Sequence, residues 1–485
     1  MTNSTAGNAL ASNPPTSQPR LGWRDRFAIA VGNAAARVSR LTGRGSGGMI
    51  GGRVALWLQP EILEHLAANR LIALVTGTNG KTTTTRMLSE AVLEGGLAVA
   101  SNRGGDNMTP GVVTALMSNL YAGVAVLEID EMHLELIAKA TCPRVIVLLN
   151  LSRDQLDRVG EIAVIEKRIR AAVDENPQAY VVANVDDPLV TSAAWDSAHP
   201  VWVAAGKGWS GDSLTAPRTG GAIVYSQDEP DTLTGESREL ASGFDRTVSW
   251  RSVPVEDLLA QEVPWDRTPI QSDFARPNPK WIWKAENFHA GSPMRLVDTA
   301  SGEDTTATVW LPGRANRGNA LQAFVAARLL GVEAQDAAAG IARVRDVAGR
   351  YASFDVQGRH IRMLLAKNPA GWMESLTMLN PQAEIIVGVN GQIADGTDLS
   401  WLWDVNFEAL SGKTVVATGE RGADLQVRLN YAGIETRWAP TVLEAIEMVA
   451  PGEVDMLLNY TSFRDARAEF VAPVSYTHLT LPTTF

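Results

Sequence analysis

The chain has 485 residues, of which 45% are apolar and 20% charged, values typical of globular proteins. This length predicts about three structural units. The formal net charge of −11 argues against a general nucleic-acid binder, and the single cysteine, Cys142, excludes an internal disulfide framework and a cysteine-clustered metal site.

Residues 1–40 are expected to form a tail that is disordered at first and then helical. Residues 2–20 are rich in small and polar side chains and lack the apolar core of an export signal. Residues 21–40 can form an amphipathic helix, and packing on the first domain is favoured over a membrane anchor. No segment has the roughly 20 consecutive apolar residues of a membrane span. The expected location is the cytoplasm, with a peripheral position at the membrane left open.

Apolar runs then alternate with helix-length segments, which is typical of an α/β domain with a parallel sheet. The predicted strands are 71–76, 123–129, 144–150, 180–183 and 201–204, and the predicted helices include 82–94 and 162–175. Residues 206–282 are rich in Gly, Ser, Asp, Thr and Pro, which predicts an inserted, small β-rich subdomain. The whole central domain is expected to cover residues 41–333.

A second, smaller α/β domain is predicted for residues 334–471. Its predicted strands are 361–366, 384–389, 414–418 and 454–458, and its predicted helices are 369–379, 421–431 and 441–449. Residues 472–485 have little charge and no helical period. They resemble translated sequencing-adapter read-through, so we expect them to replace the natural C-terminus. The alternative is an ordinary flexible tail.

The most specific motif is the run Thr-Gly-Thr-Asn-Gly-Lys-Thr-Thr-Thr at 76–84, between a predicted strand and a predicted helix. This order is typical of a phosphate-binding loop. Gly77 and Gly80 would let backbone N–H groups approach the phosphates. Lys81 can reach the β- and γ-phosphates, and the Thr82 hydroxyl can ligate Mg²⁺. The predicted nucleotide contacts are Gly77, Thr78, Asn79, Gly80, Lys81, Thr82 and Thr83.

Acidic residues follow the next long apolar strand, at the carboxyl edge where open α/β sheets bind ligands. Glu128 is expected to hold Mg²⁺ against the γ-phosphate. For Asp130 and Glu131 we favour a structural role, capping the next helix. His133 can contact the substrate or be structural, and the structural role is favoured.

The loop at 77–83 resembles the ATP loop of the Mur ligases and folylpolyglutamate synthases. Three further segments resemble motifs of that superfamily at similar spacing: 150–157, 184–187 and 311–320. The third of these, Leu-Pro-Gly-Arg-Ala-Asn-Arg-Gly-Asn-Ala, resembles the run that ends the family's central domain. This resemblance implies an ATP-dependent ligase, with Asn184 near the adenine.

Two C-terminal segments, 365–372 and 394–404, resemble signatures of one branch of this family, MurT. The segment at 44–56 also fits this branch, and no uridine-diphosphate-binding domain is expected before it. The run Asp-Gln-Leu-Asp-Arg at 154–158 has Gln where the standard enzymes have His. The resemblance covers about residues 40–470 and implies a Rossmann-like C-terminal domain.

The MurT branch implies the synthetase subunit of a lipid II isoglutaminyl synthase. This enzyme uses ATP and Mg²⁺ to amidate the α-carboxylate of D-glutamate in the lipid II stem peptide, through an acyl phosphate. A GatD-type glutaminase supplies the ammonia as the partner in a heterodimer. The implied role is peptidoglycan synthesis, with lipid II at the inner membrane surface and no nucleic-acid partner.

A Cys-His glutaminase needs a third group to orient its histidine. By resemblance, the synthetase subunit supplies that acid. Asp398 is the first choice and Asp395 the second, with Asp404 in the same acidic cluster. The alternative is that Asp398 caps a helix that begins near residue 400.

Family members commonly carry a four-cysteine zinc ribbon in the central insertion, but the insertion here has no cysteine. Ala, Thr and Ser stand where thiolates would lie, in the segments 216–220 and 272–277. We therefore predict no zinc. Packing through tryptophans is expected to hold the insertion, and loose order is the alternative. The tryptophans considered are Trp250, Trp265, Trp281 and Trp283.

Two other functions remain open. The first is a stand-alone ligase that joins an amino acid to a carboxylate, which would need an amino-acid site in the C-terminal domain. The second is a nucleotide-binding regulatory protein. The presence of Lys81, Thr82 and Glu128 together argues against this alternative, because a protein that had lost catalysis would not need to keep all three.

Overall fold

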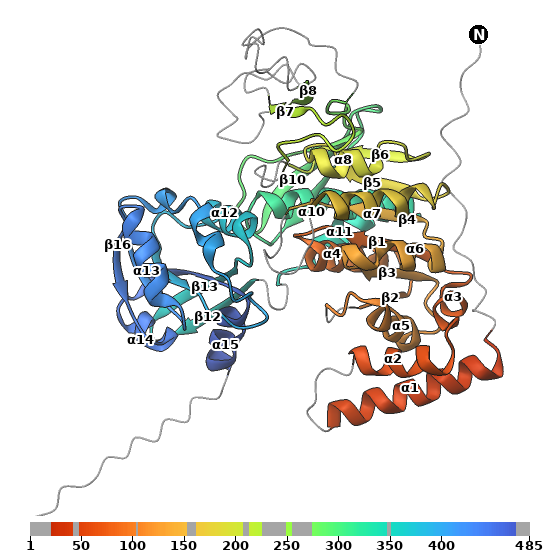
Figure 1. Cartoon of the computed structure of the whole chain (residues 1–485), viewed down its shortest axis with the longest axis horizontal. Coiled ribbons are helices and arrows are strands. Elements are labelled where there is room, and N and C mark those ends of the chain that lie inside the picture. The colour runs from red at the N-terminus through yellow and green to blue at the C-terminus, as the bar shows by residue number, and fades with distance from the viewer. Residues whose placement is uncertain are drawn as a thin grey trace, which may run out of the picture. The chain divides into compact units, whose positions relative to one another are not determined.

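The computed structural model describes residues 21–41, 48–102, 105–152, 162–206, 213–225, 249–254, 274–346 and 351–471. Its contacts divide the chain into two units (Figure 1). The first unit contains residues 1–154 and 158–347, and the second contains residues 155–157 and 348–485. The tail expected at 472–485 lies outside the described residues.

The first unit is built on a nine-stranded sheet with the strand order β11-β10-β9-β6-β5-β4-β1-β3-β2. The pairs from β2 to β6 are parallel, and β9, β10 and β11 form an antiparallel edge. The central strands are buried on both faces, which explains their nearly continuous apolar sequence. The strands are β1 (Leu71–Thr76), β2 (Val99–Ser101), β3 (Val124–Glu128), β4 (Val145–Leu148), β5 (Tyr180–Asn184), β6 (Pro200–Val203), β9 (Trp281–Lys284), β10 (Ser292–Asp298) and β11 (Asp304–Val309).

Helices lie beside this sheet, and α4 packs with α10 and α11. The packing of α4 on α11 is close, because a Cβ at Gly340 would lie 2.4 Å from the Cα atom of Ala91. The sequence assigned residues 334–347 to the second domain, but these contacts group them with the first unit. The helices are α3 (Ile62–Ala67), α4 (Lys81–Glu94), α5 (Thr109–Ser118), η1 (Glu131–His133), α6 (Leu134–Thr141), α7 (Ile162–Asp174), α8 (Pro188–Ala194), α10 (Arg314–Leu329) and α11 (Ala334–Ile341).

Two further helices, α1 (Trp23–Leu41) and α2 (Gly48–Leu58), lie at the outside of the first unit (Figure 1). They cross closely at two glycines, because a Cβ at Gly32 would lie 2.7 Å from the carbonyl oxygen of Gly51. The helix α2 packs in turn on α5. No helix among the described residues is long and apolar enough to cross a membrane.

The described part of the insertion contains a two-stranded antiparallel ribbon, β7 (Ala222–Tyr225) and β8 (Trp250–Val253). The Trp250 ring is buried, lies 5.0 Å from the Phe274 ring, and donates its indole N–H to the carbonyl of Val185 at 2.8 Å. The ribbon is thus joined to the end of β5 by a packed tryptophan.

Two other tryptophans do not belong to this ribbon. Trp281 and Trp283 lie in β9 of the main sheet, where they pack on Phe324 and Phe288, so the prediction that they hold the insertion is wrong. The physical reason is that β9 continues the sheet through β10. Trp265 lies outside the described residues.

The second unit has a six-stranded sheet with the order β12-β13-β17-β14-β15-β16, in which only β12 is antiparallel to its neighbour. Trp372, Trp401 and Phe407 form an aromatic cluster in its core. Its elements are β12 (Tyr351–Val356), β13 (Arg359–Leu365), α12 (Pro369–Thr377), β14 (Glu384–Gly388), η2 (Ser400–Asp404), η3 (Phe407–Leu410), β15 (Thr414–Thr418), α13 (Gly422–Tyr431), β16 (Glu435–Trp438), α14 (Val442–Glu447), β17 (Gly452–Leu458) and α15 (Tyr460–Val471).

Candidate functional site

The predicted phosphate-binding loop lies at the carboxyl end of β1, between β1 and α4. Gly77 and Gly80 have φ values of +134° and +87°, which other residues rarely adopt. A Cβ at Gly77 would lie 2.9 Å from the Asn150 carbonyl oxygen, and one at Gly80 would lie 2.6 Å from the Asn319 side-chain oxygen. Both glycines are therefore required by backbone conformation and by the close approach of neighbouring segments.

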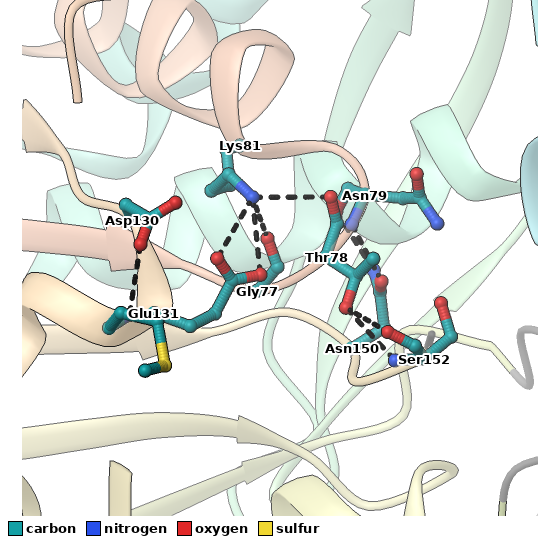
Figure 2. A network of polar contacts seen from close by, with 9 residues as sticks. Gly77, Thr78, Asn79, Lys81, Asp130, Glu131, Asn150 and Ser152 are labelled. Carbon is teal, nitrogen blue, oxygen red and sulfur yellow. Dashed lines mark hydrogen bonds and ion pairs between the residues drawn. The ribbon is translucent and has the colours of Figure 1, made fainter. Parts of the chain in front are cut away.

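The segment after β4 fixes the shape of this loop (Figure 2). The Asn150 side chain accepts a hydrogen bond from the Asn79 N–H and donates one to the Asn79 carbonyl, both at 2.9 Å. The Thr78 hydroxyl donates to the Ser152 carbonyl and accepts from the Ser152 N–H, also at 2.9 Å. These contacts tie the loop to the segment after β4, and sequence reasoning assigned none of them.

Lys81 is the first residue of α4, and its ammonium group lies over the loop (Figure 2). It donates to the carbonyls of Gly77 and Thr78, at 2.5 and 3.2 Å, and forms an ion pair with Glu131 at 3.2 Å. The expected capping role of Glu131 is therefore wrong. The Lys81 ammonium thus has three acceptors within the chain, the carbonyls of Gly77 and Thr78 and the Glu131 carboxylate.

Asp130 has the role expected for it, since its carboxylate accepts a hydrogen bond from the N–H of Met132 and caps η1. His133 ends the same short helix and is half-buried. Among the described residues, no hydrogen bond to the His133 ring is found that would fix its orientation for catalysis.

The first turn of α4 can bind an anion. Its N-cap residue is Gly80, and no side chain caps this helix end. The N–H groups of the first turn and the positive end of the helix dipole thus face the loop, which suits a phosphate group. Thr82 is half-exposed in this turn, where its hydroxyl can reach a ligand.

Glu128 ends β3, which pairs with β1 so that Glu128 is the partner of Val75. The side-chain amide of Asn102 accepts from the N–H of Glu128 at 2.8 Å and donates to its carbonyl at 2.7 Å. The side chain of Glu128 is buried, yet its carboxylate has no hydrogen bond or ion pair with the described residues. The Glu128 carboxylate oxygens are not among the fully buried, unpaired polar atoms, so they retain some solvent access and can face a cation.

The oxygen atoms of Glu128 and Thr82 suit Mg²⁺, which prefers oxygen ligands and usually retains water and phosphate oxygens. The described residues contain no group of three or more His, Cys, Asp or Glu side chains that could hold a metal by themselves. A metal at this position would therefore depend on the phosphates for part of its coordination.

The motif at 184–187 braces the ends of neighbouring strands. Asn184 donates to the Gly206 carbonyl at 3.0 Å and accepts from the N–H groups of Asp186 and Ala205 at 3.1 Å. These bonds occupy the side-chain oxygen of Asn184 and one of its amide hydrogens. The adenine contact assigned to Asn184 by resemblance stays a prediction.

The two acids of this motif have different partners. Asp186 pairs with Arg276 at 2.8 Å. Asp187 accepts from the N–H of Leu151 at 2.8 Å and from two N–H groups in the first turn of α8. Burial raises the pKa of Asp187 to about 6, and the three backbone donors partly oppose this shift. The motif therefore connects the loop after β4 to α8.

The motif at 311–320 places the start of α10 against the phosphate-binding loop. Arg317 is fully buried and donates to the carbonyls of Leu311 and His289. A Cβ at Gly318 would lie 2.0 Å from the carbonyl oxygen of Ala205, so the helix meets that backbone directly. This packing holds Asn319 beside Gly80.

In the second unit, the three candidate acids differ sharply in environment. Asp395 is buried, accepts from the N–H of Thr461 at 2.9 Å, and bonds the hydroxyl of Thr461. Asp398 is exposed and accepts from the N–H of Ser400 at 2.8 Å. The Ser400 backbone N–H lowers the pKa of Asp398, so the side chain is a carboxylate at neutral pH. Asp404 is exposed at the end of η2.

These environments decide which acid a partner could use. Asp395 is committed to the first turn of α15, which argues against its role as the second choice. Asp398 does cap the turn at residue 400, the alternative considered from the sequence. A carboxylate has about four acceptor positions, so one bond to Ser400 leaves Asp398 able to accept from another donor.

A phosphate-binding loop after the first strand of a mostly parallel sheet, with a buried acid on the adjacent strand, defines a nucleotide-binding α/β protein. Comparisons with known proteins show which families this chain resembles. The family model of the Mur ligase middle domain matches residues 75–211, and the model described as MurT ligase C-terminal matches residues 365–463.

Two relatives named lipid II isoglutaminyl synthase (glutamine-hydrolyzing) subunit MurT are similar along their whole length. The Staphylococcus aureus protein is 27% identical, over 90% of this chain and 96% of its own. The Streptococcus pneumoniae protein is 28% identical, over 92% of this chain and 97% of its own. The chain is therefore similar to MurT subunits over about nine tenths of its length, and it matches the Mur ligase middle-domain and MurT C-terminal models.

Solved structures support the fold. A pseudomurein peptide ligase type C from Methanothermus fervidus has a TM-score of 0.62 and 18% identity, and the match covers 84% of this chain and 80% of that one. MurF from Acinetobacter baumannii has a TM-score of 0.60 and 16% identity, over 86% and 80% of the two chains. The predicted fold class, a Mur-ligase ATPase domain followed by a Rossmann-like α/β domain, is confirmed.

Proposed function

We propose that this chain is the synthetase subunit of a lipid II isoglutaminyl synthase. It would amidate the α-carboxylate of D-glutamate in the lipid II stem peptide, with consumption of ATP, during peptidoglycan synthesis. The observation that carries the proposal is the similarity to MurT subunits over about 90% of the chain, which includes an intact phosphate-binding loop.

A carboxylate is a poor electrophile, and ATP would activate it as an acyl phosphate that ammonia then attacks, releasing phosphate. The chain contributes positioning and charge stabilisation. The N–H groups of the loop and of the first turn of α4 hold the phosphates. Lys81 exchanges Glu131 for the transferring phosphoryl group and stabilises its charge. Thr82 and Glu128 would hold Mg²⁺, which neutralises the phosphate oxygens.

The ammonia would come from a GatD-type glutaminase bound as a heterodimer. The exposed carboxylate of Asp398 is our choice for the group that orients the partner's histidine. Its support is twofold: it is ionised at neutral pH and accessible, whereas Asp395 is buried in bonds to Thr461.

The test is an amidation assay with purified chain, lipid II and ATP, analysed by mass spectrometry of the stem peptide. Three nitrogen sources are compared: ammonium, glutamine with the glutaminase, and free amino acids. The proposal expects amidated product with the first two only. Product that contains an added amino acid would instead show a stand-alone ligase, and phosphate release without any acceptor would favour a regulatory protein.

Lys81→Ala is the control for the ATP site. It is expected to lower amidation by about 100-fold or more, which is the usual cost of losing transition-state charge stabilisation. Circular dichroism and thermal unfolding would verify that the variant is folded. Amidation within tenfold of the wild-type rate would remove Lys81 from the proposed role.

A further inference from the structure

The helix α1 exposes an apolar stripe along its whole length. Trp23, Phe27 and Leu41 are 75%, 56% and 87% exposed, and they lie on one face of the helix, because their spacing follows the helical period. The exposed residues that complete this stripe are Ala30, Ala34 and Val38. On the neighbouring helix α2, Trp57 is 81% exposed but lies away from the buried Gly51 and Ala55 that face α1, so it is not part of this stripe.

The opposite face of α1 already has its packing partner. Its buried residues include Ala28, Gly32 and Ala36, and Gly32 lies against Gly51 of α2. The stripe is therefore not the face by which α1 joins the first unit. It is a second apolar face, on the outermost helix of the unit in Figure 1.

The charge around the stripe is positive. Four arginines of α1 are exposed, namely Arg24, Arg26, Arg37 and Arg40. The one acid in α1 and α2 is Asp25, which is buried. It accepts hydrogen bonds from Gln59 and the N–H of Gly22 and bonds the ring of His65, so its charge faces inward. This surface is basic although the chain carries a net charge of −11.

We propose that the exposed apolar stripe of α1 docks on an anionic lipid bilayer and lies in its interface. Large apolar residues in a helical stripe, flanked by arginines, are typical of interfacial amphipathic helices. Tryptophan favours the boundary between acyl chains and headgroups, and the arginines attract anionic headgroups. The helix α1 is too polar to span the bilayer, which leaves a position parallel to the surface.

A protein partner is the competing occupant, since exposed apolar patches serve both purposes. The distribution of charge favours the membrane, because arginines flank the stripe on both sides and no exposed acid of α1 or α2 is present to pair with a partner's bases. The proposal rests on this face alone and does not depend on the proposed amidation. If that reaction is correct, docking would bring the chain to the surface that holds a lipid-linked substrate.

The test is flotation of the full-length chain with two kinds of vesicles, pure phosphatidylcholine and a mixture rich in phosphatidylglycerol. The wild type is expected to float with the anionic vesicles and to lose binding as NaCl is raised from 0.1 to 0.5 M, because salt screens the arginines. The double variant Trp23→Glu/Phe27→Glu is expected to bind about tenfold more weakly or worse, since both aromatic anchors of the stripe are replaced by acids. Tyr431→Glu is the matched control: it removes an aromatic side chain that is 76% exposed in the second unit, and it should bind as the wild type does.

Each result has a definite meaning. Wild-type protein that does not float with anionic vesicles overturns the proposal, as does equal binding by the wild type and the double variant. Concentration-dependent self-association without vesicles, lost in the double variant, would assign the face to a second copy of the chain instead. Thermal unfolding of the variants checks that the fold is intact, and amidation with ammonium and a soluble stem peptide separates membrane docking from the reaction itself.

Discussion

At the scale of single residues, the ion pair between Lys81 and Glu131 links the phosphate-binding loop to the acidic segment after β3. Both side chains are largely buried, with about a tenth of each exposed. A phosphate must displace the Glu131 carboxylate to bind Lys81. Glu131 thus competes with the nucleotide and keeps the ammonium group over the loop until a nucleotide arrives.

Glu131→Gln is expected to tighten the binding of a non-hydrolysable ATP analogue by about three- to tenfold, because the variant removes a charge-assisted competitor of roughly 1 kcal/mol. Isothermal titration calorimetry measures this change. Asp130→Asn is the matched control, since it alters the adjacent acid that caps η1. Weaker binding by Glu131→Gln would show that Glu131 holds Lys81 toward the phosphates instead.

Asp398→Asn distinguishes two roles of Asp398: capping the turn at residue 400, and orienting the histidine of the glutaminase partner. Asparagine can still accept the hydrogen bond of Ser400, but it lacks the charge that stabilises an imidazolium ion. Glutamine-driven amidation is expected to fall by up to about 10⁴-fold, as when a triad acid is neutralised, while ammonium-driven amidation persists.

Asp404→Asn is the control for Asp398→Asn, because it neutralises a nearby exposed acid. Co-elution with the glutaminase verifies that the complex still forms. Equal loss with both nitrogen donors, or no loss with glutamine, would remove Asp398 from this role.

At the scale of elements, the β7–β8 ribbon is held by the packed tryptophan Trp250, in the insertion for which the sequence predicted no zinc. Ala216 and Phe274, from the two segments that resemble the zinc ribbon, pack with Trp250 in one apolar cluster. Thr219, at another of these positions, bonds the hydroxyl of Ser252. Ser272 lies outside the described residues.

Trp250→Ala is expected to destabilise the ribbon by about 3–5 kcal/mol, the usual cost of deleting a buried aromatic side chain. Limited proteolysis of the insertion would detect this loss. The control is Trp57→Ala, an exposed tryptophan whose removal should change stability by less than about 0.5 kcal/mol. A chelator should leave the melting temperature of the wild type unchanged, and one zinc ion per chain in metal analysis would contradict the packing explanation.

The elements that sequence reasoning placed well are those with a strong local signal. The bounds of β1 and β15 agree with prediction, because strands buried on both faces are nearly continuous apolar runs. Two of the strands it missed have weak local signals: β2 has three residues, and β16 is mostly exposed with charged side chains. Such segments form strands because they pair with a neighbouring strand, and the local sequence pattern does not indicate that pairing.

The residues of the candidate site likewise fall into those that could be predicted from a local motif and those that could not. Gly77, Gly80 and Lys81 stand within one short motif, so their arrangement could be predicted. The contacts of Asn102 and Asn150 could not, because strands distant in sequence bring them to one edge of the sheet. Asn150 lies two residues after the end of the apolar strand β4, and that position is the signal that could have found it.

At the scale of the whole molecule, the chain consists of two units, and the phosphate-binding loop belongs to the first. Differential scanning calorimetry is expected to show that an ATP analogue with Mg²⁺ raises the transition of the first unit alone. At 100 times the dissociation constant, the stabilisation is about 2.7 kcal/mol. Lys81→Ala should abolish the shift. An equal rise of both transitions would mean that the two units unfold cooperatively.

The bond between Asp395 and Thr461 has a consequence for anyone who shortens this chain. A shortened chain that ends at Leu458 keeps all six strands of the second sheet, so its sheet topology is complete. The truncation nevertheless removes the N–H and the hydroxyl that hold Asp395, and the loop that carries Asp398 loses its anchor. A truncated protein or a reporter fused at that point would bind nucleotide normally and yet fail with glutamine.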